Sequence, residues 1–338
     1  MAEIPQVSVI LPVYNAAATL KETLESIFKQ TLSDFELIVV DDGSTDDSAE
    51  IISAFQRNDS RIHLIQQENM GVSAASNRAL TQARAECVAR MDADDIMMPR
   101  RLELQYAYLR DHPEVDLVGC QVELFPAEKV QGGFKEYMRW QNSCLSVEDM
   151  QDERYVELTI ANPTLFFRRS VVQDLGGYRE GDFPEDYDLL LRLLQAGHQL
   201  AKVDEMLLRW RESDIRLTRT HERYSREAFD RLRVDHLSKD ERLHAGREIY
   251  VWGAGRKTRQ RANLLLQKGI AFSAWIDIDP RKIGNRVAGI PVNSPDCLKT
   301  DKKPFVLVYV TNHGAKELIG ADLARFGYER GADYLMVG

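Results

Sequence analysis

The N-terminal part of the chain alternates between short apolar runs and longer amphipathic segments, and this alternation limits the fold more than any other feature. The apolar runs predict buried strands at Val7–Val13, Phe35–Val40, Arg61–Gln66 and Cys87–Met91. The segments between them predict helices over Ala16–Gln30, around Ile51–Phe55 and over Val72–Arg84. This alternation indicates an α/β fold, mainly a parallel sheet with helices on both faces, which binds ligands at the carboxyl ends of its strands.

Acidic residues follow the last of these strands, in the stretch M-D-A-D-D at 91–95. Asp92, Asp94 and Asp95 repel one another when they are ionised, so they suit a hard divalent cation such as Mn²⁺ or Mg²⁺, which takes oxygen ligands. The alternative is a solvated turn that caps a helix beginning near Pro99. The stretch alone favours neither interpretation.

Polar residues also follow the first two strands. Tyr14 offers a ring on which a nucleobase can stack, and Asp42 can accept a hydrogen bond from a pyrimidine N–H or a ribose hydroxyl. Each also has a simpler structural interpretation, as a strand-end aromatic and as part of a turn. In the stretch D-D-G-S-T at 41–45, Gly43 permits a positive φ and a hydroxyl side chain after it predicts a helix cap. No glycine-rich phosphate loop follows the first strand, so a cation would have to hold most of a diphosphate.

Composition excludes several classes of protein. A net charge of −9 on 338 residues argues against a nucleic-acid partner. The four cysteines are widely spaced, which suggests a reducing compartment rather than a disulfide framework or a metal site. The N-terminus lacks the pattern of a signal peptide, and no apolar run has membrane-spanning length. A cytoplasmic protein is expected, and peripheral contact with the inner face of a membrane stays open.

Several short motifs together resemble those of the inverting family 2 glycosyltransferases. They are P-V-Y-N at 12–15, Q-T at 30–31, V-V-D-D-G-S-T-D at 39–46, E-N-M-G-V-S-A-A-S-N at 68–77, M-D-A-D-D at 91–95, N-P-T-L-F-F-R-R-S at 162–170, L-G-G-Y-R at 175–179 and E-D-Y-D-L-L-L-R at 185–192. The resemblance covers roughly the first two thirds of the chain. Each motif is weak alone, but their order and spacing are specific.

The resemblance implies the GT-A nucleotide-diphospho-sugar transferase fold and Mn²⁺ or Mg²⁺ at the metal motif Asp92 and Asp94. It implies a nucleotide-sugar donor, a UDP-sugar first, and a glycan or lipid-linked glycan acceptor, as in bacterial surface polysaccharide synthesis. The donor-binding residues that it implies are Pro12, Tyr14, Asn15, Asp41, Asp42, Asn77 and Asp92.

The chain departs from the family pattern at two places. Many relatives carry an arginine at the position of Ser76, where it can meet the diphosphate, and Arg78 or Arg90 could replace it. Relatives often have a histidine where Ser213 stands, so we assign no third metal ligand. Either departure would also fit a non-catalytic protein that binds a nucleotide sugar.

A third acidic group lies at the start of the apolar segment Phe183–Leu194, which predicts a helix. The helix dipole should keep Glu185, Asp186 and Asp188 ionised near neutral pH. By the resemblance, Asp186 is the base that takes the proton of an acceptor hydroxyl, and Glu185 shapes the site. A single displacement would then invert the anomeric centre, with no covalent intermediate. Acidic helix capping is the structural alternative.

Two stretches between these motifs keep open interpretations. The aromatic-rich insertion Val122–Leu158 could recognise the acceptor, pack against the core or form a lid. Asn162-Pro163-Thr164 should start a strand that returns to the sheet beside the site. The basic run at 209–220 could bind an anionic substrate, although such runs are more often solvated surfaces.

The C-terminal part predicts a second domain. We expect a catalytic domain over 1–237, a linker over 238–246 and a Rossmann-like α/β domain over 247–338, with strands in 248–256, 271–278 and 305–310 and a helix over 312–326. Gly253 and Gly255 match the start of a dinucleotide turn, but Thr258 stands where the third glycine would be. Asp277 could meet a ribose, and the basic residues that open the next helix could instead bind an anion.

Three classes of function remain at this point. A metal-dependent glycosyltransferase needs Asp92, Asp94 and Asp186 together. A non-catalytic nucleotide-sugar-binding or regulatory protein would bind the donor without transfer. An oxidoreductase built on the C-terminal domain ranks last, because no tyrosine–lysine catalytic pair is apparent there. Assembly into a homo-oligomer stays open.

Overall fold

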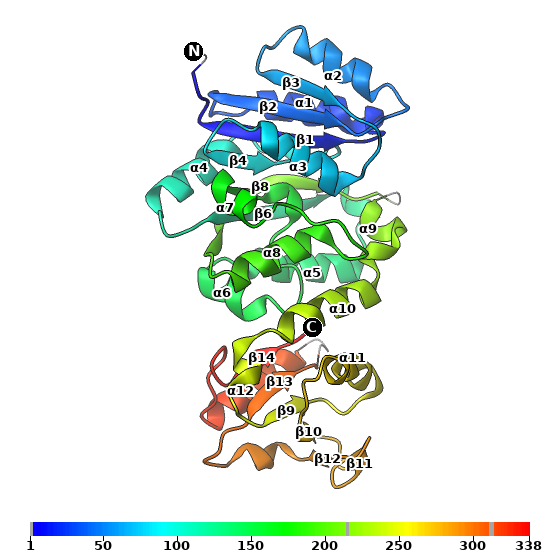
Figure 1. Ribbon diagram of the computed structural model, residues 1–338, viewed down its shortest axis with the longest axis vertical. Helices are drawn as coiled ribbons and strands as arrows, with labels where there is room; N and C mark the ends of the chain where they lie inside the picture. Colours follow the sequence, from blue (N-terminus) through cyan, green and yellow to red (C-terminus); the bar gives the residue numbers. More distant parts are fainter. Residues whose placement is uncertain (1–2, 214–215, 311–313) are drawn as a thin grey trace. The chain divides into compact units, whose positions relative to one another are not determined.

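The computed structural model describes residues 3–213, 216–310 and 314–338. The chain forms two compact units, each with its own sheet (Figure 1). The first comprises Met1–Met150 and Leu158–Tyr224, and the second comprises Gln151–Glu157 and Ser225–Gly338. The predicted division into a catalytic domain over 1–237, a linker over 238–246 and a C-terminal domain over 247–338 concerns domains that fold independently. This division stays a prediction.

The N-terminal half of the first unit is the predicted alternation of strands and helices, which is confirmed. Its elements are β1 (Val7–Val13), α1 (Ala17–Phe28), β2 (Phe35–Asp41), α2 (Ser48–Gln56), β3 (Ile62–Gln66), α3 (Val72–Gln82) and β4 (Cys87–Arg90). The strands lie parallel in the order β3-β2-β1-β4. Every residue of β1 and β2 is buried, which explains their unbroken apolar sequences.

The other half of this sheet is mixed, with the strand order β4-β7-β6-β8-β5. These strands are β5 (Ile96–Met97), β6 (Leu117–Phe125), β7 (Phe166–Arg168) and β8 (Leu200–Arg211). The short β7 lies antiparallel between β4 and β6, so the predicted return of the chain after Asn162 is confirmed. The first three residues of the basic run end β8, and the pairing of β8 with β5 brings Arg209 beside Ile96. This part of the chain also contains α4 (Arg101–Asp111), α7 (Arg169–Asp174), α8 (Glu185–Gln195) and α9 (Leu217–Thr220).

The insertion Val122–Leu158 is ordered by two helices, α5 (Gly132–Ser143) and α6 (Val147–Glu153). The Tyr137 hydroxyl and the Gln141 amide both donate to the carbonyl of Leu158, each over 2.9 Å. The insertion is therefore folded back on itself and packed.

The second unit contains a sheet with the strand order β11-β12-β10-β9-β13-β14. Its elements are α10 (Arg226–Leu237), β9 (Ile249–Trp252), α11 (Arg256–Gln267), β10 (Ala274–Ile276), β11 (Arg286–Val287), β12 (Ile290–Asn293), β13 (Phe305–Val308), α12 (Ala315–Arg325) and β14 (Tyr334–Met336). All neighbours are parallel except β11 and β12. The three predicted strands are confirmed with shorter bounds. Of the predicted helix, residues 312 and 313 lie outside the described residues.

A short segment from the insertion, Gln151–Glu157, belongs to this second unit. The side chain of Tyr155 is fully buried, and its carbonyl accepts the backbone N–H of Gly338 over 2.8 Å. Arg154 Nη2 donates to Asp240 Oδ2 over 2.8 Å, and Arg233 Nη2 donates to the carbonyl of Val156 over 3.1 Å. The second unit thus surrounds a segment whose two ends continue into the first unit.

Within the described ranges, no helix is both long enough and apolar enough to cross a membrane.

Asp240 is the most strongly paired carboxylate of this region. Its oxygens accept from Arg154, from Arg242 Nη2 over 2.6 Å and from the Tyr155 hydroxyl over 3.1 Å. Burial alone would raise the pKa of Asp240, but the hydrogen bond and charge of Arg242, then those of Arg154, hold it well below its ordinary value of 3.8. The stabilisation is therefore present above that ordinary value and is lost as the pH falls toward the pKa in the folded state.

We predict that Asp240→Asn lowers the free energy of unfolding by about 3 kcal/mol at neutral pH, because two arginines lose their buried counter-charge. The difference from wild type should shrink as the pH falls below 3.8, where the wild-type carboxylate begins to lose its advantage over the unfolded state. Chemical unfolding over a pH series measures both. Asp296→Asn is the control, because its ion pair with Lys299 is exposed and its loss should change little. Equal effects of both substitutions would contradict the prediction.

Candidate active site

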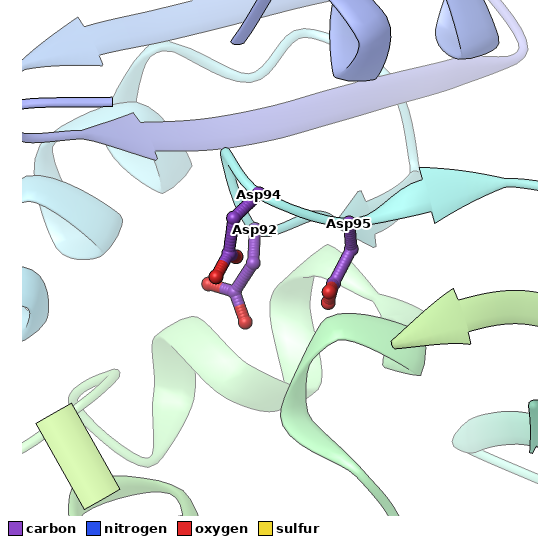
Figure 2. A group of neighbouring side chains, drawn as sticks. All are labelled: Asp92, Asp94 and Asp95. Carbon is purple, nitrogen blue, oxygen red and sulfur yellow. The ribbon is translucent and has the colours of Figure 1, made fainter. Parts of the chain in front are cut away.

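The acidic loop after β4 brings its carboxyl groups together. Asp92, Asp94 and Asp95 each offer an oxygen within 4.8 Å of the others, and the three side chains point to the same side of the loop (Figure 2). Asp92 and Asp94 are partly exposed, whereas Asp95 is fully buried. The alternative of a solvated helix cap is wrong, because α4 starts after Arg100 and no described side chain caps it.

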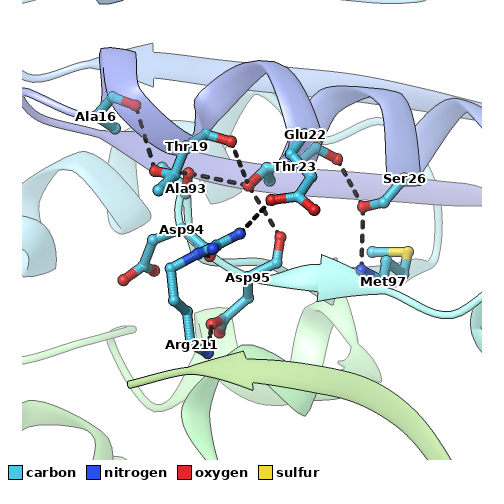
Figure 3. A network of polar contacts seen from close by, with 10 residues as sticks. All are labelled: Ala16, Thr19, Glu22, Thr23, Ser26, Ala93, Asp94, Asp95, Met97 and Arg211. Atoms are coloured by element: carbon cyan, nitrogen blue, oxygen red, sulfur yellow. Dashed lines mark hydrogen bonds and ion pairs between the residues drawn. The ribbon is translucent and has the colours of Figure 1, made fainter. Parts of the chain in front are cut away.

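Helix α1 holds this loop through its hydroxyl side chains. Thr19 Oγ1 and Thr23 Oγ1 lie 3.1 and 3.0 Å from the carbonyl oxygen of Ala93, and Thr23 Oγ1 lies 2.9 Å from that of Asp95 (Figure 3). Ser26 Oγ accepts the backbone N–H of Met97 over 3.0 Å. Helix α1, which follows β1, therefore fixes the backbone of this loop.

Arg211, at the end of β8, fixes the loop from the other side. Its backbone N–H donates to Asp95 Oδ1 over 2.7 Å, and its Nε donates to the carbonyl of Asp94 over 2.6 Å. Its guanidinium also forms an ion pair with Glu22 of α1 (Figure 3). Arg211 thus fixes the carboxyl group of Asp95 and the backbone of Asp94.

The loop is electrostatically strained. Burial, followed by the charge of Asp92, raises the pKa of Asp94 to about 6. Burial and the charges of Asp94 and Asp92 raise the pKa of Asp95 well above its ordinary range. Asp95 Oδ2 is buried and has no hydrogen-bond partner among the described residues. A bound cation would relieve both the repulsion and this unsatisfied oxygen, so the donor set fits a divalent metal ion.

A buried arginine lies beneath this loop. Arg90, the last residue of β4, is only 2% exposed, and its Nη1 lies 2.5 Å from Asp92 Oδ1. Arg78, the other residue considered as a replacement for the arginine missing at Ser76, is exposed on α3, and Ser76 is itself buried. Arg90 is therefore committed to the acidic loop rather than open to solvent.

The ends of β1 and β2 are joined by Asn15. Its side-chain oxygen accepts the backbone N–H of Thr45 over 2.8 Å, and its own N–H donates to Ser44 Oγ over 3.0 Å. The prediction that a hydroxyl at 44 or 45 caps the next helix is wrong, because α2 starts only at Ser48. Asp41 is buried and accepts the N–H of Ser44 over 3.1 Å.

The remaining residues at these strand ends differ in exposure. Pro12 is buried within β1 opposite Val40, so it shapes the strand end rather than presenting a polar group. Tyr14 is 52% exposed, which leaves its ring available for stacking.

Asp42 organises the loop before α3. Its carboxylate accepts from Gln67 Nε2 over 2.6 Å and from the backbone N–H groups of Met70 and Gly71 over 2.9 and 2.8 Å. Gly43 has the expected positive φ of 75°, and a Cβ there would lie 2.8 Å from a backbone nitrogen. A direct contact between Asp42 and a nucleoside stays a prediction, since much of its acceptor capacity is already used.

Asn77 ties α3 to the loop before α8. Its amide donates to the carbonyl of Tyr178 over 2.7 Å and accepts the N–H of Tyr178 over 2.8 Å. A Cβ at Gly177 would lie 2.3 Å from the Asn77 oxygen, so the contact requires glycine there. This positioning role was missed in the sequence, although the resemblance had singled out both motifs.

The acids at the start of α8 have different partners. Glu185 is buried and accepts the Tyr224 hydroxyl at 2.7 and 2.9 Å, with Arg223 Nη1 at 3.7 Å. Asp188 is fully buried and pairs with Arg192 Nε over 2.7 Å and with Arg179. These two carboxylates hold the helix in place.

Asp186 differs from both, because it remains partly exposed. Protein atoms still crowd its carboxyl group, and this desolvation, followed by the charge of Glu185, raises the pKa of Asp186 to about 7. The expectation that the helix dipole keeps this acid ionised near neutral pH is therefore wrong. The backbone N–H of Tyr187 donates to Asp186 Oδ1 over 2.7 Å and favours the ionised form of Asp186. The effect of burial on the pKa is larger.

Arg90 connects the two acidic groups electrostatically. Burial lowers the pKa of Arg90, and the negative charges of Asp92, Tyr178 and Glu185 raise it. Its charge also favours the ionised forms of Asp94 and Asp186. Arg90 thus interacts electrostatically with the predicted metal ligands and with the predicted base.

Part of the basic run is paired rather than solvated. Glu212 is buried and pairs with Arg216 at 3.3 Å and Arg219 at 2.7 Å. Arg216 stacks over the Trp210 ring at 4.2 Å, and its charge favours the ionised form of Asp94. Ser213 makes no contact that bears on the acidic loop among the described residues.

The glycine turn of the second unit is closed by Asp277. Its Oδ2 accepts the backbone N–H of Ala254 over 2.9 Å and pairs with Lys282 at 2.9 Å. Gly253 has a φ of 114°, and a Cβ there would lie 2.9 Å from Val310. The carboxylate that we considered for a ribose is thus engaged within the protein.

The mixed sheet with an acidic loop at its strand ends matches the GT-A fold. In structure the chain is similar to S. aureus TarS 1-349 in complex with UDP-GlcNAc, with a TM-score of 0.56, 20% identity and coverage of 78% of this chain and 71% of that one. The model described as glycosyl transferase family 2 matches residues 8–176, so the chain belongs to this family. The GT-A fold and the family resemblance are therefore confirmed.

Two relatives show the same similarity in sequence. The amylovoran biosynthesis glycosyltransferase AmsE of Erwinia amylovora is 31% identical over 207 residues, which are 60% of this chain and 75% of that protein. The O-antigen biosynthesis glycosyltransferase WbnJ of Escherichia coli is 32% identical over 189 residues, which are 56% of this chain and 71% of that protein.

Proposed function

We propose that this chain is an inverting glycosyltransferase that moves a sugar from a nucleoside diphosphate donor, a UDP-sugar, to an acceptor hydroxyl. The observation that carries the proposal is the approach of the Asp92, Asp94 and Asp95 carboxyl groups to within 4.8 Å, because it offers a cation site. The charge of Arg90 also acts on both Asp94 and Asp186, which supports a base near that site.

The cation would be Mn²⁺ or Mg²⁺, held by Asp92 and Asp94 with Asp95 behind them. The mutual approach of these carboxyl groups within 4.8 Å and the unsatisfied buried oxygen of Asp95 support this assignment. When bound, such a cation stabilises the negative charge of the departing diphosphate.

The donor would lie at the ends of β1, β2 and β4. The exposed ring of Tyr14 supports a stacking role against the base. The other predicted donor residues, which shape these strand ends and the loops beside them, are Pro12, Asn15, Asp41, Asp42 and Asn77. TarS, which shares the fold, is described in complex with UDP-GlcNAc, and this supports a uridine diphosphate sugar as the first donor to test.

Asp186 would act as the general base. Its partial exposure gives an acceptor hydroxyl a way to reach it, and a pKa of about 7 suits proton transfer near neutral pH. Glu185, held by Tyr224, would keep the start of α8 in position. As Asp186 removes the proton, the acceptor oxygen attacks the anomeric carbon and inverts it.

The acceptor would be a glycan or a lipid-linked glycan. The names of the relatives from Erwinia amylovora and Escherichia coli refer to amylovoran and O-antigen biosynthesis, which supports a role in bacterial surface polysaccharide synthesis. The second unit would be a Rossmann-like domain, since its parallel strands follow the order β12-β10-β9-β13-β14.

The alternative is a non-catalytic protein that binds a nucleotide sugar. Ser76 favours it, because its buried side chain offers no positive charge to a diphosphate. Donor binding without hydrolysis or transfer over a broad panel of acceptors would support this alternative.

We predict that UDP binds in the presence of Mn²⁺ and that Asp94→Asn weakens this binding at least about tenfold, because a carboxylate ligand is replaced by a neutral amide. Calorimetric titration of UDP and GDP, with and without Mn²⁺, measures the affinity and identifies the base. Asp111→Asn, on the exposed end of α4, is the matched control and should bind as wild type does. Binding that ignores both Mn²⁺ and Asp94 would overturn the proposed cation site.

We also predict that the rate of UDP release from the donor, by transfer or hydrolysis, rises with pH up to about 7 and then levels, because Asp186 must be ionised to act as a base. Glu185→Gln should move this limb to lower pH, since it removes the neighbouring negative charge that raises the pKa of Asp186. A pH profile of kcat/KM checks both. A limb that does not move in Glu185→Gln would contradict the assignment.

A further inference from the structure

The side chain of Arg90 is almost completely buried, and a buried guanidinium is costly unless nearby groups compensate it. Its Nη1 lies 2.5 Å from Asp92 Oδ1, but Nε and Nη1 make no well-aligned hydrogen bond among the described residues. The compensation therefore comes mainly from charge, in the ion pair with Asp92.

A second buried arginine nearby shows that burial alone does not explain this arrangement. Arg101 is fully buried, and its guanidinium donates to neutral acceptors, the carbonyl of Arg90 over 2.8 Å and Gln105 Oε1 over 2.9 Å. Arg90, by contrast, faces a charged acceptor, the carboxyl group of Asp92.

The Asp92 carboxyl group has Arg90 as its polar side-chain contact among the described residues. The side chain of Asp92 is 30% exposed. The contact involves one oxygen of Asp92, Oδ1, and the Asp92 carboxyl group lies next to that of Asp94 (Figure 2). The positive charge also offsets the repulsion between the clustered aspartates.

We propose that Arg90 is a positioning residue that holds Asp92 in the orientation needed to bind the divalent cation. This rests on the proposed function, in which Asp92 is a metal ligand. Arg90 acts through Asp92 from beneath the loop, and it does not replace the arginine missing at Ser76 as a contact to the diphosphate. Groups that orient a metal ligand commonly change metal affinity by roughly 10- to 100-fold when they are removed.

The test compares Mn²⁺ affinity, measured by titration with the electron paramagnetic resonance signal of free Mn²⁺, in the full chain and two variants of Arg90. We expect Arg90→Met to weaken Mn²⁺ binding about tenfold or more, and Arg90→Lys to recover part of the loss, because lysine keeps the charge but not the planar fork. Thermal unfolding of each variant reports stability separately.

Arg192→Met is the matched control, since Arg192 is also a mostly buried arginine paired with an aspartate, Asp188, on the helix that carries the proposed base. It should lose stability and keep the Mn²⁺ affinity of wild type. Unchanged Mn²⁺ affinity in Arg90→Met, or equal losses in Arg90→Met and Arg192→Met, would overturn the positioning role. If Arg90→Met does not fold, Arg90→Gln replaces it. Wild-type Mn²⁺ affinity in a folded Arg90→Gln, together with wild-type affinity in Arg90→Lys and Arg192→Met, would also overturn the positioning role. Absence of Mn²⁺ binding in wild type would instead overturn the cation site itself.

Discussion

Negative charge crowded at the end of β4 is the constraint on which the catalytic unit depends. The carboxyl groups of Asp92, Asp94 and Asp95 lie within 4.8 Å of one another, an arrangement that would spread apart in a flexible loop. The fold prevents this by fixing the backbone and by supplying charge. Helix α1 and Arg211 bind the carbonyls of the loop, and Arg90 supplies a buried positive charge.

The same constraint explains the arrangement of the sheet around the loop. Strands β1 and β4 are parallel neighbours in the buried centre, so the loop starts from a rigid platform. The two residues of β5 then pair with β8, which carries Arg211 back over the loop. The acidic loop is therefore held between two halves of one sheet, and each half contributes a part of its support.

The parallel half of the sheet could be predicted because strands buried on both faces have continuous apolar sequences. Strand β8 was missed because its middle residues are exposed and its end belongs to a basic run, and β5 is too short to leave a pattern. The family could be recognised from its motifs, and the same motifs predicted the metal ligands and the base.

The raised pKa of Asp186 and the burial of Arg90 could not be predicted from the sequence, because both follow from packing by distant parts of the chain. The link between Asn77 and Tyr178 joins residues 101 positions apart, which local patterns cannot show. The chain also passes between its two units three times, because Gln151–Glu157 belongs to the second unit. Tyr155 in that segment is buried. Part of the insertion therefore belongs to the core of the second unit, which is not made only from the C-terminal part of the chain.

The most direct test of this account is a crystal structure of the chain grown with Mn²⁺ and UDP, with the manganese located by its anomalous scattering. The account predicts one strong peak about 2 Å from carboxylate oxygens of Asp92 and Asp94, on the side of the loop away from Arg90. A manganese peak elsewhere in the chain, with UDP bound and the aspartates unligated, would contradict it.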